Sequence, residues 1–469
     1  MQDHNQPNLK MLLMLIFLIF MGCSPSKQEA NEMEVMAFVG ARIIDGTGAD
    51  PIEGGVLLIT NGKILEVGSQ QDIEIPAGAQ VMDVKGKVIM PGIINAHGHV
   101  GIADGLESGY SRENVIRDLE VNARYGVTTI VSLGNDEQPS AQIRNEQNTL
   151  LLTRSRLFLA GEVVTGETPE AVKEAIDRNV NMGVDFIKIR VDDNLGNSKK
   201  MPAEIYQTVI NYSHELGYRV ASHIFYLEDA KTLLRTGTDY IAHSVRDRGV
   251  DQEFIDLMNE AEVYYCPTLM REVSTFVFAS EPDYFSDPFF TKEVDSGTIA
   301  QLRDPERMNR VASSTSAKAY RIALDTALMN LKKLADAGVT IVMGTDSGVS
   351  GRFPGYFEHL EMEMMVDAGM TPMEVIVAST GGSAKALKLE GLGSLQPGNW
   401  ADFIVLDQDP LTDIKNTRSI SSVWIAGNKI EESAAPQAFQ NNFSSGGKFV
   451  AHRQADGQAH SFEFADIGL

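Results

Sequence analysis

Short runs of apolar and β-branched residues alternate with longer amphipathic stretches through the middle of the chain. The apolar runs are typical of buried strands, and the stretches between them place apolar residues at helical spacing. We predict eight strands, at residues 89–97, 126–133, 156–160, 184–191, 218–225, 238–244, 263–269 and 339–346. The predicted helices cover residues 169–182, 202–216, 227–235, 251–260 and 320–337. This alternation predicts an α/β fold, a (β/α)8 TIM barrel, in which the long segment 271–316 is a loop region after the seventh strand.

Both ends of the chain show a different pattern, of short strands separated by turn residues. Asn61-Gly62 between two such runs is typical of a hairpin turn. Similar runs recur at 398–410 and 421–430, so we expect one small β-sandwich domain built from N- and C-terminal segments. The predicted divisions are a signal peptide at 1–22, a tether at 23–34, the small domain at 35–90 and 396–432, the barrel at 91–395, and a C-terminal tail at 433–469.

The N-terminal segment indicates export. Lys10 precedes the apolar run 11–22, which is shorter than the ~20 residues that a spanning helix needs. Gly22 directly before Cys23 is similar to the lipobox of bacterial lipoproteins, so we expect a lipid on Cys23. The expected location is the bacterial cell envelope, lipid-anchored and facing the periplasm, or secreted. A plain signal peptide or an uncleaved anchor are the alternatives.

Composition, charge and cysteine content limit the classes of protein to which the chain can belong. Hydrophobic content of 43% and charged content of 22% are those of a globular protein. A net charge of −24 argues against nucleic-acid binding, because phosphates would be repelled. If Cys23 carries lipid, the second cysteine, Cys266, has no partner for an internal disulfide. Cys266 lies in the apolar run 263–267, which favours a buried structural thiol over a nucleophile.

Histidines stand at the ends of several predicted strands. His97 and His99 follow the first strand in a His-x-His pattern, which places both imidazoles on one side. Paired imidazoles suit a divalent metal of zinc type, although a polar turn would also hold two histidines. Barrel active sites lie at the carboxyl ends of the strands. The other candidates at such ends are Lys188, His223, His243 and Asp346.

These residues, with the flanking segments 41–68 and 379–411, resemble the amidohydrolase superfamily of metal-dependent hydrolases. The most similar branch holds imidazolonepropionase-related and prolidase-like proteins with a bridging carboxylated lysine. The resemblance implies two divalent metal ions, with zinc expected. The implied ligands are His97, His99, Lys188 and Asp346 for the first metal, and Lys188, His223 and His243 for the second.

Lys188 also has a physical reason to be modified. Burial beside cationic metals lowers the pKa of a lysine, which favours the neutral amine that takes up carbon dioxide. The resulting carbamate is an anion able to bridge two metals. The alternative is that Lys188 extends to a carboxylate, Asp192 or Asp193.

The resemblance predicts hydrolysis of a C–N bond in an amide, dipeptide or cyclic amide. Paired metals acidify a shared water, and Asp346 would shuttle its proton to the leaving amine. Tyr226 could donate to the substrate carbonyl oxygen. Arg271 could bind a substrate carboxylate, or instead pair with Glu272.

Two other functions compete with this prediction. The first is a mononuclear-metal deaminase of the same barrel class, against which Lys188 argues. The second is a non-catalytic envelope binding lipoprotein, against which the complete ligand set argues. The expected partner is a small amide or peptide substrate, with no nucleic acid, membrane contact through the lipid alone, and a possible homo-oligomer.

Overall fold

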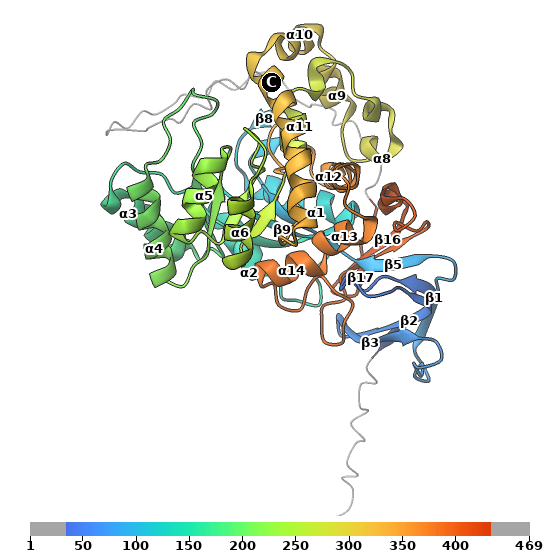
Figure 1. Cartoon of the computed structure of the whole chain (residues 1–469). Helices are drawn as coiled ribbons and strands as arrows, with labels where there is room; N and C mark the ends of the chain where they lie inside the picture. The colour runs from blue at the N-terminus through green and yellow to red at the C-terminus, as the bar shows by residue number, and fades with distance from the viewer. Residues whose placement is uncertain (1–33, 433–469) are drawn as a thin grey trace, which may run out of the picture.

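Strands from the two ends of the chain lie side by side in one mixed sheet (Figure 1) in the computed structural model, which describes residues 34–432. The strand order is β17-β16-β15-β5-β1-β2-β3, with β4 paired to β1. Strand β15 pairs antiparallel with β5, which joins the late segment to the early one. The bounds are β1 Val35–Ile43, β2 Ile52–Thr60, β3 Lys63–Ser69, β4 Gln80–Asp83, β5 Val88–Pro91, β15 Phe403–Leu406, β16 Ile420–Ile425 and β17 Asn428–Lys429.

Most of the predicted strands of this sheet are confirmed, and so is its hairpin. Asn61 and Gly62 have φ values of 49° and 69°, the left-handed conformation that a two-residue hairpin turn requires. The structure records a single sheet in this region, so a division into two packed sheets stays a prediction. The predicted signal peptide, Cys23 and C-terminal tail lie outside the described residues.

Seven parallel strands form the centre of the molecule. One group has the order β10-β9-β6 and the other β11-β12-β13-β14. Isolated parallel bridges join Val164 to Ile189 between the groups, and Tyr265 to Ile341 beyond β14. The bounds are β6 Ile93–Gly98, β9 Val127–Ser132, β10 Arg156–Leu159, β11 Ile187–Arg190, β12 Val220–His223, β13 Tyr240–Ala242 and β14 Tyr264–Cys266.

Two strand predictions need correction. The predicted first strand, 89–97, is divided at Gly92: β5 belongs to the end-to-end sheet and β6 to the central strands. A Cβ at Gly92 would lie 2.1 Å from Thr128 Oγ1, so the chain passes here against β9 too closely for a side chain. The predicted eighth strand, 339–346, forms a bridge only at Ile341, although it lies between β14 and β6, since Val342 donates to the Tyr265 carbonyl and Ala96 donates to the Met343 carbonyl.

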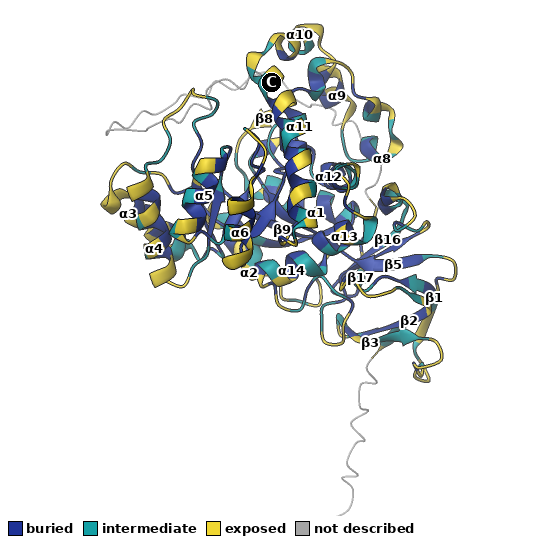
Figure 2. Ribbon diagram, in the orientation of Figure 1, coloured by how far each residue is buried: buried dark blue, intermediate teal, exposed yellow. Residues whose placement is uncertain are grey.

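Helices follow the central strands and bury their inner faces (Figure 2). The prediction for 169–182 matches α3 at both ends, since Thr168 accepts from the Ala171 N–H and Gly183 ends the helix at φ 84°. The bounds are α1 Arg112–Arg124, α2 Gln138–Asn145, α3 Pro169–Met182, α4 Ala203–Glu215, α5 Leu227–Thr236, α6 Gln252–Glu260, α11 Thr315–Asp336, α12 Tyr356–Asp367, α13 Pro372–Ala378 and α14 Gly381–Leu387, with the 3-10 turn η3 at Ile414–Arg418.

The segment predicted as a long loop, 271–316, is instead a series of short helices. Its aromatic residues explain the difference, because Phe278, Phe285 and Phe290 pack in one buried cluster with Tyr356 of α12. The short elements here and after β6 are β7 Ala103–Asp104, β8 Glu107–Ser108, α7 Leu269–Ser274, η1 Val277–Ala279, η2 Asp283–Ser286, α8 Pro288–Thr291, α9 Ser296–Leu302 and α10 Pro305–Ser313. Within residues 34–432, no helix combines the length and apolar character needed to cross a membrane.

Candidate metal centre

Five of the six predicted ligands lie within a central strand or directly after one, and Asp346 ends the segment 339–346. His97 and Lys188 belong to β6 and β11, His223 ends β12, and His243 follows β13 directly. Four of the six are buried, with His97 and His243 each 1% exposed. His99 and His223 are partly exposed, with side-chain exposures of 10% and 13%. The site is therefore closed by protein on most sides and open beside these two imidazoles.

The structure brings the six side chains into one continuous set of contacts. Asp346 Oδ1 lies 2.8 Å from His99 Nε2 and 3.5 Å from His97 Nε2. Lys188 Nζ lies 3.3 Å from the same His97 nitrogen. The ring centroid of His243 lies 4.5 Å from that of His97 and 4.1 Å from that of His223, which joins His223 to the set. Residues separated by up to 249 positions thus meet at one end of the strands.

The alternative partner for Lys188 is engaged elsewhere. Asp192 Oδ2 lies 2.6 Å from His223 Nε2, and the other carboxylate oxygen accepts from the Asn194 N–H. Asp193 accepts from the Tyr226 hydroxyl at 2.8 Å. Lys188 therefore faces the His97 imidazole rather than either carboxylate.

Three of the four imidazoles have one nitrogen held by a protein group outside the six. His99 Nδ1 donates to the Gly134 carbonyl at 3.0 Å, and His243 Nδ1 lies 2.7 Å from Thr268 Oγ1. His223 uses Nε2 toward Asp192. Fixing one nitrogen sets the ring orientation and leaves the other available to a metal. Among the described residues, His97 Nδ1 is buried without a hydrogen-bond partner.

The contact between His99 and Asp346 tests whether a metal fits. A carbonyl only accepts, so the Gly134 oxygen places the His99 proton on Nδ1. A neutral ring then directs the Nε2 lone pair at Asp346 Oδ1, which is also a lone-pair donor, at 2.8 Å. Two such atoms repel each other unless a proton or a cation lies between them. His97, His99 and Asp346 offer ligand atoms within 4.8 Å of one another, so a metal ion suits this position.

Electrostatics favour the deprotonated form of four of the six side chains, His97, His223, His243 and Asp346. Burial lowers the pKa of His97 and His243 well below the usual value, and Lys188 adds to the effect. Burial likewise lowers the pKa of His223 to about 3, although Asp192 opposes it, and the pKa of Lys188 to about 8. Burial would raise the pKa of Asp346, but Arg352, His97 and His99 hold it well below its usual range. The neutral imidazoles of His97, His223 and His243 and the ionised carboxylate of Asp346 are in the protonation states that bind divalent metals.

Backbone strain is concentrated at the same place. His243, Asp346 and Thr268 have positive φ values of 74°, 60° and 47°. Each such non-glycine conformation costs roughly 1–3 kcal/mol and is retained where the surrounding structure requires it. The backbone at Gly348 passes so close to the His99 carbonyl oxygen that only glycine fits, because a Cβ there would lie 1.9 Å from that oxygen.

Sequence reasoning missed Arg352, which forms an ion pair with Asp346 Oδ2. Arg352 is 9% exposed, and its Nε donates to Ser274 Oγ at 2.9 Å. It lies in the glycine-containing turn after Asp346, where neither strand nor helix periodicity indicates a direction for its side chain. Asp192 and Thr268 were missed as imidazole partners for the same reason.

The two predicted substrate residues, Tyr226 and Arg271, lie beside the centre without contacting the six. Tyr226 donates to Asp193, as described above. Arg271 Nη1 lies 3.2 Å from Glu272 Oε2, which is the alternative that the sequence left open. Glu272 also pairs with the buried Arg246 at 3.0 Å, so one carboxylate serves two guanidinium groups.

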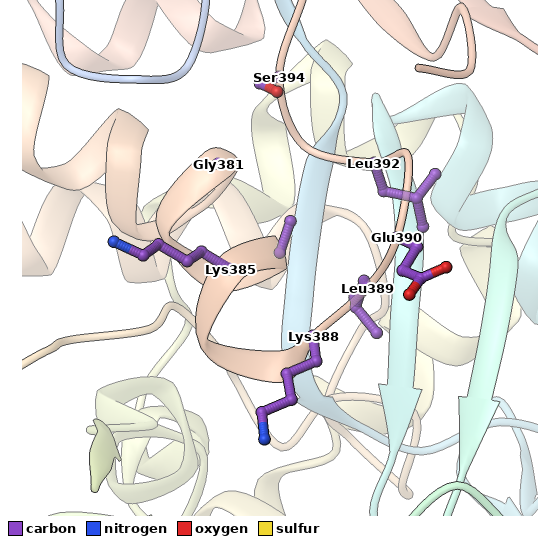
Figure 3. A pocket seen from close by; sticks show the side chains of 8 residues that line it. Gly381, Lys385, Lys388, Leu389, Glu390, Leu392 and Ser394 are labelled. Atoms are coloured by element: carbon purple, nitrogen blue, oxygen red, sulfur yellow. The ribbon is translucent and has the colours of Figure 1, made fainter. Parts of the chain in front are cut away.

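Cys266 fits its structural interpretation. The thiol is free and fully buried, and burial raises its pKa far above the usual value. A separate cavity of about 270 Å³ lies against α14 and includes Lys385, Lys388 and Glu390 in its lining (Figure 3). None of the six predicted ligands lines this cavity.

Comparison with known proteins identifies the family of this chain. The sequence profile of the Amidohydrolase family matches residues 88–430. Ochratoxinase from Aspergillus niger is 22% identical over 455 residues, covering 85% of this chain and 87% of the relative. A 5-methylthioadenosine/S-adenosylhomocysteine deaminase from Bacillus cereus is 23% identical over 376 residues, with coverages of 76% and 81%.

Among solved structures, a putative prolidase from Bifidobacterium longum superposes with a TM-score of 0.69 at 24% identity, covering 85% of this chain and 95% of that one. This likeness supports the TIM-barrel fold expected of the central strands. The matched region contains all six candidate ligands and all seven central strands. The chain belongs to the amidohydrolase family of metal-dependent hydrolases.

Proposed function

We propose that this protein is a binuclear-metal amidohydrolase that cleaves a C–N bond in a small amide, dipeptide or cyclic amide. The observation that carries the proposal is the position of Lys188, whose Nζ lies 3.3 Å from His97 Nε2 among neutral imidazoles. In our assignment His97, His99 and Asp346 would hold one metal, and His223 and His243 would hold the other. Lys188, if carboxylated at Nζ by carbon dioxide, would supply an anionic ligand to both.

When bound, divalent metals would supply Lewis acidity and a water acidic enough to ionise near neutral pH. Asp346 accepts the proton of the attacking water and delivers it to the leaving nitrogen. Arg352 pairs with Asp346 Oδ2, which fixes the carboxylate and leaves Oδ1 directed toward His97 and His99. Burial of the site excludes the bulk water that would compete for that proton.

The substrate that we favour carries a carboxylate close to the scissile bond. Arg246, Arg271 and Arg352 are buried near the centre, whereas Glu272 and Asp346 are the carboxylates paired with them. Buried guanidinium groups favour an anionic partner with two oxygens. In this proposal Arg271 binds the substrate carboxylate and Tyr226 turns from Asp193 to the substrate carbonyl oxygen.

An activity screen with a matched binding measurement tests the proposal. The protein, supplied with zinc or manganese and bicarbonate, is assayed with dipeptides, N-acyl amino acids and lactams. We expect turnover of carboxylate-bearing amides and weaker turnover of the corresponding C-terminal amides, with Arg271→Met reducing that preference. Two metals per chain without turnover of any C–N bond would contradict the function while leaving the metal assignment intact.

The second candidate is a deaminase with one metal, favoured by the fact that His97, His99 and Asp346 alone can surround an ion and by the deaminase relative. Lys188→Ala separates the two functions. A variant that retains full activity with one metal per chain favours the deaminase. Loss of activity together with one metal favours the bridged centre.

Two further parts of the proposal concern architecture and location. The parallel bridges Val164–Ile189, Tyr265–Ile341 and Gly98–Ser347 support closure of the central strands into a complete barrel. We also propose anchoring in the cell envelope through lipidated Cys23. Cys23→Ser should move the expressed protein from the membrane fraction to the soluble one, and an unchanged distribution would contradict the anchor.

A further inference from the structure

Helix α12 carries two fully enclosed glutamates that are not among the predicted metal ligands. Glu358 lies in the first turn of the helix, Glu361 lies one turn later, and both residues are 0% exposed. Glu361 accepts from the backbone N–H groups of Leu269 and Met270, each at 2.7 Å. Glu358 accepts instead from side chains, and these side chains belong to residues close in sequence to predicted metal ligands.

One oxygen of Glu358 accepts three hydrogen bonds. Asn95 Nδ2 and the Ser347 hydroxyl each donate to Oε1 at 2.6 Å, and the Thr345 hydroxyl donates at 3.0 Å. Thr345 Oγ1 also accepts from the Ser347 N–H at 3.0 Å, which leaves its own proton for Glu358. All three donor residues are buried. Loss of this oxygen would therefore leave three enclosed donors without the acceptor that they share.

Two of these donors are the neighbours of Asp346 in the chain. Thr345 precedes Asp346 and Ser347 follows it, so their shared acceptor holds both sides of a residue whose φ is 60°. A non-glycine residue keeps such a conformation where the surrounding structure requires it. Glu358 supplies this requirement and so fixes the direction of the Asp346 side chain. The Ser347 carbonyl also accepts from the His99 N–H at 2.8 Å, which ties a second ligand to the same segment.

The third donor, Asn95, extends the same control to His97. Because Glu358 binds the Nδ2 group, the Asn95 carbonyl oxygen is directed away from it and accepts from the His97 N–H at 3.0 Å. The His97 carbonyl in turn accepts from the Asp346 N–H at 2.6 Å. One carboxylate oxygen on α12 is thereby connected to the backbone of every ligand that we assign to the first metal.

We propose that Glu358 is a positioning residue for the metal held by His97, His99 and Asp346. The inference rests on the metal assignment in the proposed function. None of the three donors to Glu358 is itself a predicted ligand, so Glu358 acts by holding the ligand segments at the spacing that a metal needs. Loss of a residue that orients metal ligands weakens metal affinity by about 10- to 100-fold.

Titration of the metal-free, full-length protein with cobalt(II) tests this role, because the visible absorption of the bound ion reports its ligands. A His223→Asn background removes one ligand of the second metal, so the titration measures the first site. In this background Glu358→Met should weaken cobalt binding about 10- to 100-fold. Glu358→Gln keeps an oxygen that can accept from the three donors, so it should restore most of the affinity that Glu358→Met loses.

His359→Leu is the matched control, because it alters the next residue on α12 at the same depth. His359 is 0% exposed, its Nε2 donates to the Tyr125 carbonyl at 2.9 Å, and its Nδ1 lies 2.9 Å from Thr417 Oγ1. The substitution should lower the free energy of unfolding and leave cobalt affinity unchanged. Equal weakening of cobalt binding in His359→Leu and Glu358→Met would show that Glu358 only stabilises α12, and would overturn the proposal.

Ser347→Ala tests the same contact by a smaller change, and decides the matter if Glu358→Met does not fold. It removes one hydroxyl beside Asp346 and leaves the backbone and Glu358 in place. Cobalt affinity should fall by a smaller factor than in Glu358→Met, and unchanged affinity would overturn the proposal. Absence of cobalt binding by the unaltered protein would contradict the proposed function instead, so the two failures are seen separately.

Discussion

The two ends of the central strands have opposite chemistry. At the carboxyl end, charged and titratable side chains are buried together, two of them on strained backbone. Toward α14, the interior holds a purely apolar cluster in which Leu387, Leu389 and Leu392 pack against residues of the strands, including Ile94 and Val131. Apolar packing stabilises the fold at no electrostatic cost, whereas buried charges destabilise it unless paired. The difference teaches that the carboxyl end is arranged for chemistry and the α14 end for stability.

The largest effect is expected on activity, when the buried amine at the carboxyl end is replaced. Lys188→Met replaces a buried amine by an apolar side chain of similar size. We expect one metal per chain in place of two and a fall in kcat/KM on the order of 10³-fold, the equivalent of several kcal/mol of charge stabilisation. The free energy of unfolding of the metal-free variant should be unchanged or higher, as measured by urea denaturation. Two metals and full activity in this variant would contradict the bridging role.

A core substitution at the α14 end should lower the stability of the protein and leave its activity unchanged. Leu387→Ala, in a residue 1% exposed, removes buried methyl groups and should lower the free energy of unfolding by about 2–5 kcal/mol. Below the unfolding transition, kcat per folded molecule and metal content should equal those of the wild type. A variant that loses metal while remaining folded would show that the two ends are not independent.

Asp192→Asn tests how the carboxyl end of the strands positions one of its imidazoles. Asp192 orients His223 at 2.6 Å, and loss of such a partner weakens metal affinity by about 10- to 100-fold. Activity should return at high metal concentration, as a metal titration would show. Asp193→Asn, which removes the acceptor of the Tyr226 hydroxyl, is the control and should leave metal affinity unchanged.

The smallest effect is expected at Cys266, between the two ends. Its thiol belongs to the apolar cluster, so Cys266→Ala should cost about 1 kcal/mol of unfolding free energy and leave kcat unchanged. A thiol reagent should react with the wild type only after denaturation. Fast labelling of the native protein with loss of activity would assign the thiol a chemical role.

The central strands and their helices were predictable because each is encoded locally. Apolar runs located seven strands, and α3 was located at both ends, since Thr168 and Gly183 are strong capping signals. The eighth predicted strand is only partly regular: it forms a bridge at Ile341, and Asp346 at its end adopts a positive φ that its apolar neighbours do not reveal. The segment 271–316 failed because its aromatic residues pack with α12, which is distant in sequence.

The site also has residues that could be predicted from the sequence and residues that could not. His97, His99, Lys188, His223 and His243 could be found because each ends or follows an apolar run, and barrel strands place such ends together. Their supporting contacts could not be found, since Arg352, Thr268 and Asp192 lie outside the helices and strands, where side-chain directions depend on the whole fold. Tertiary packing, rather than any local pattern, decides which polar turn residues face the centre.

Anomalous diffraction from crystals grown with zinc and bicarbonate tests the central claim most directly. The account predicts two zinc peaks, one beside His97, His99 and Asp346 and one beside His223 and His243, with carboxyl density on Lys188 Nζ between them. A single peak beside His97, His99 and Asp346, with an unmodified amine on Lys188, would contradict it.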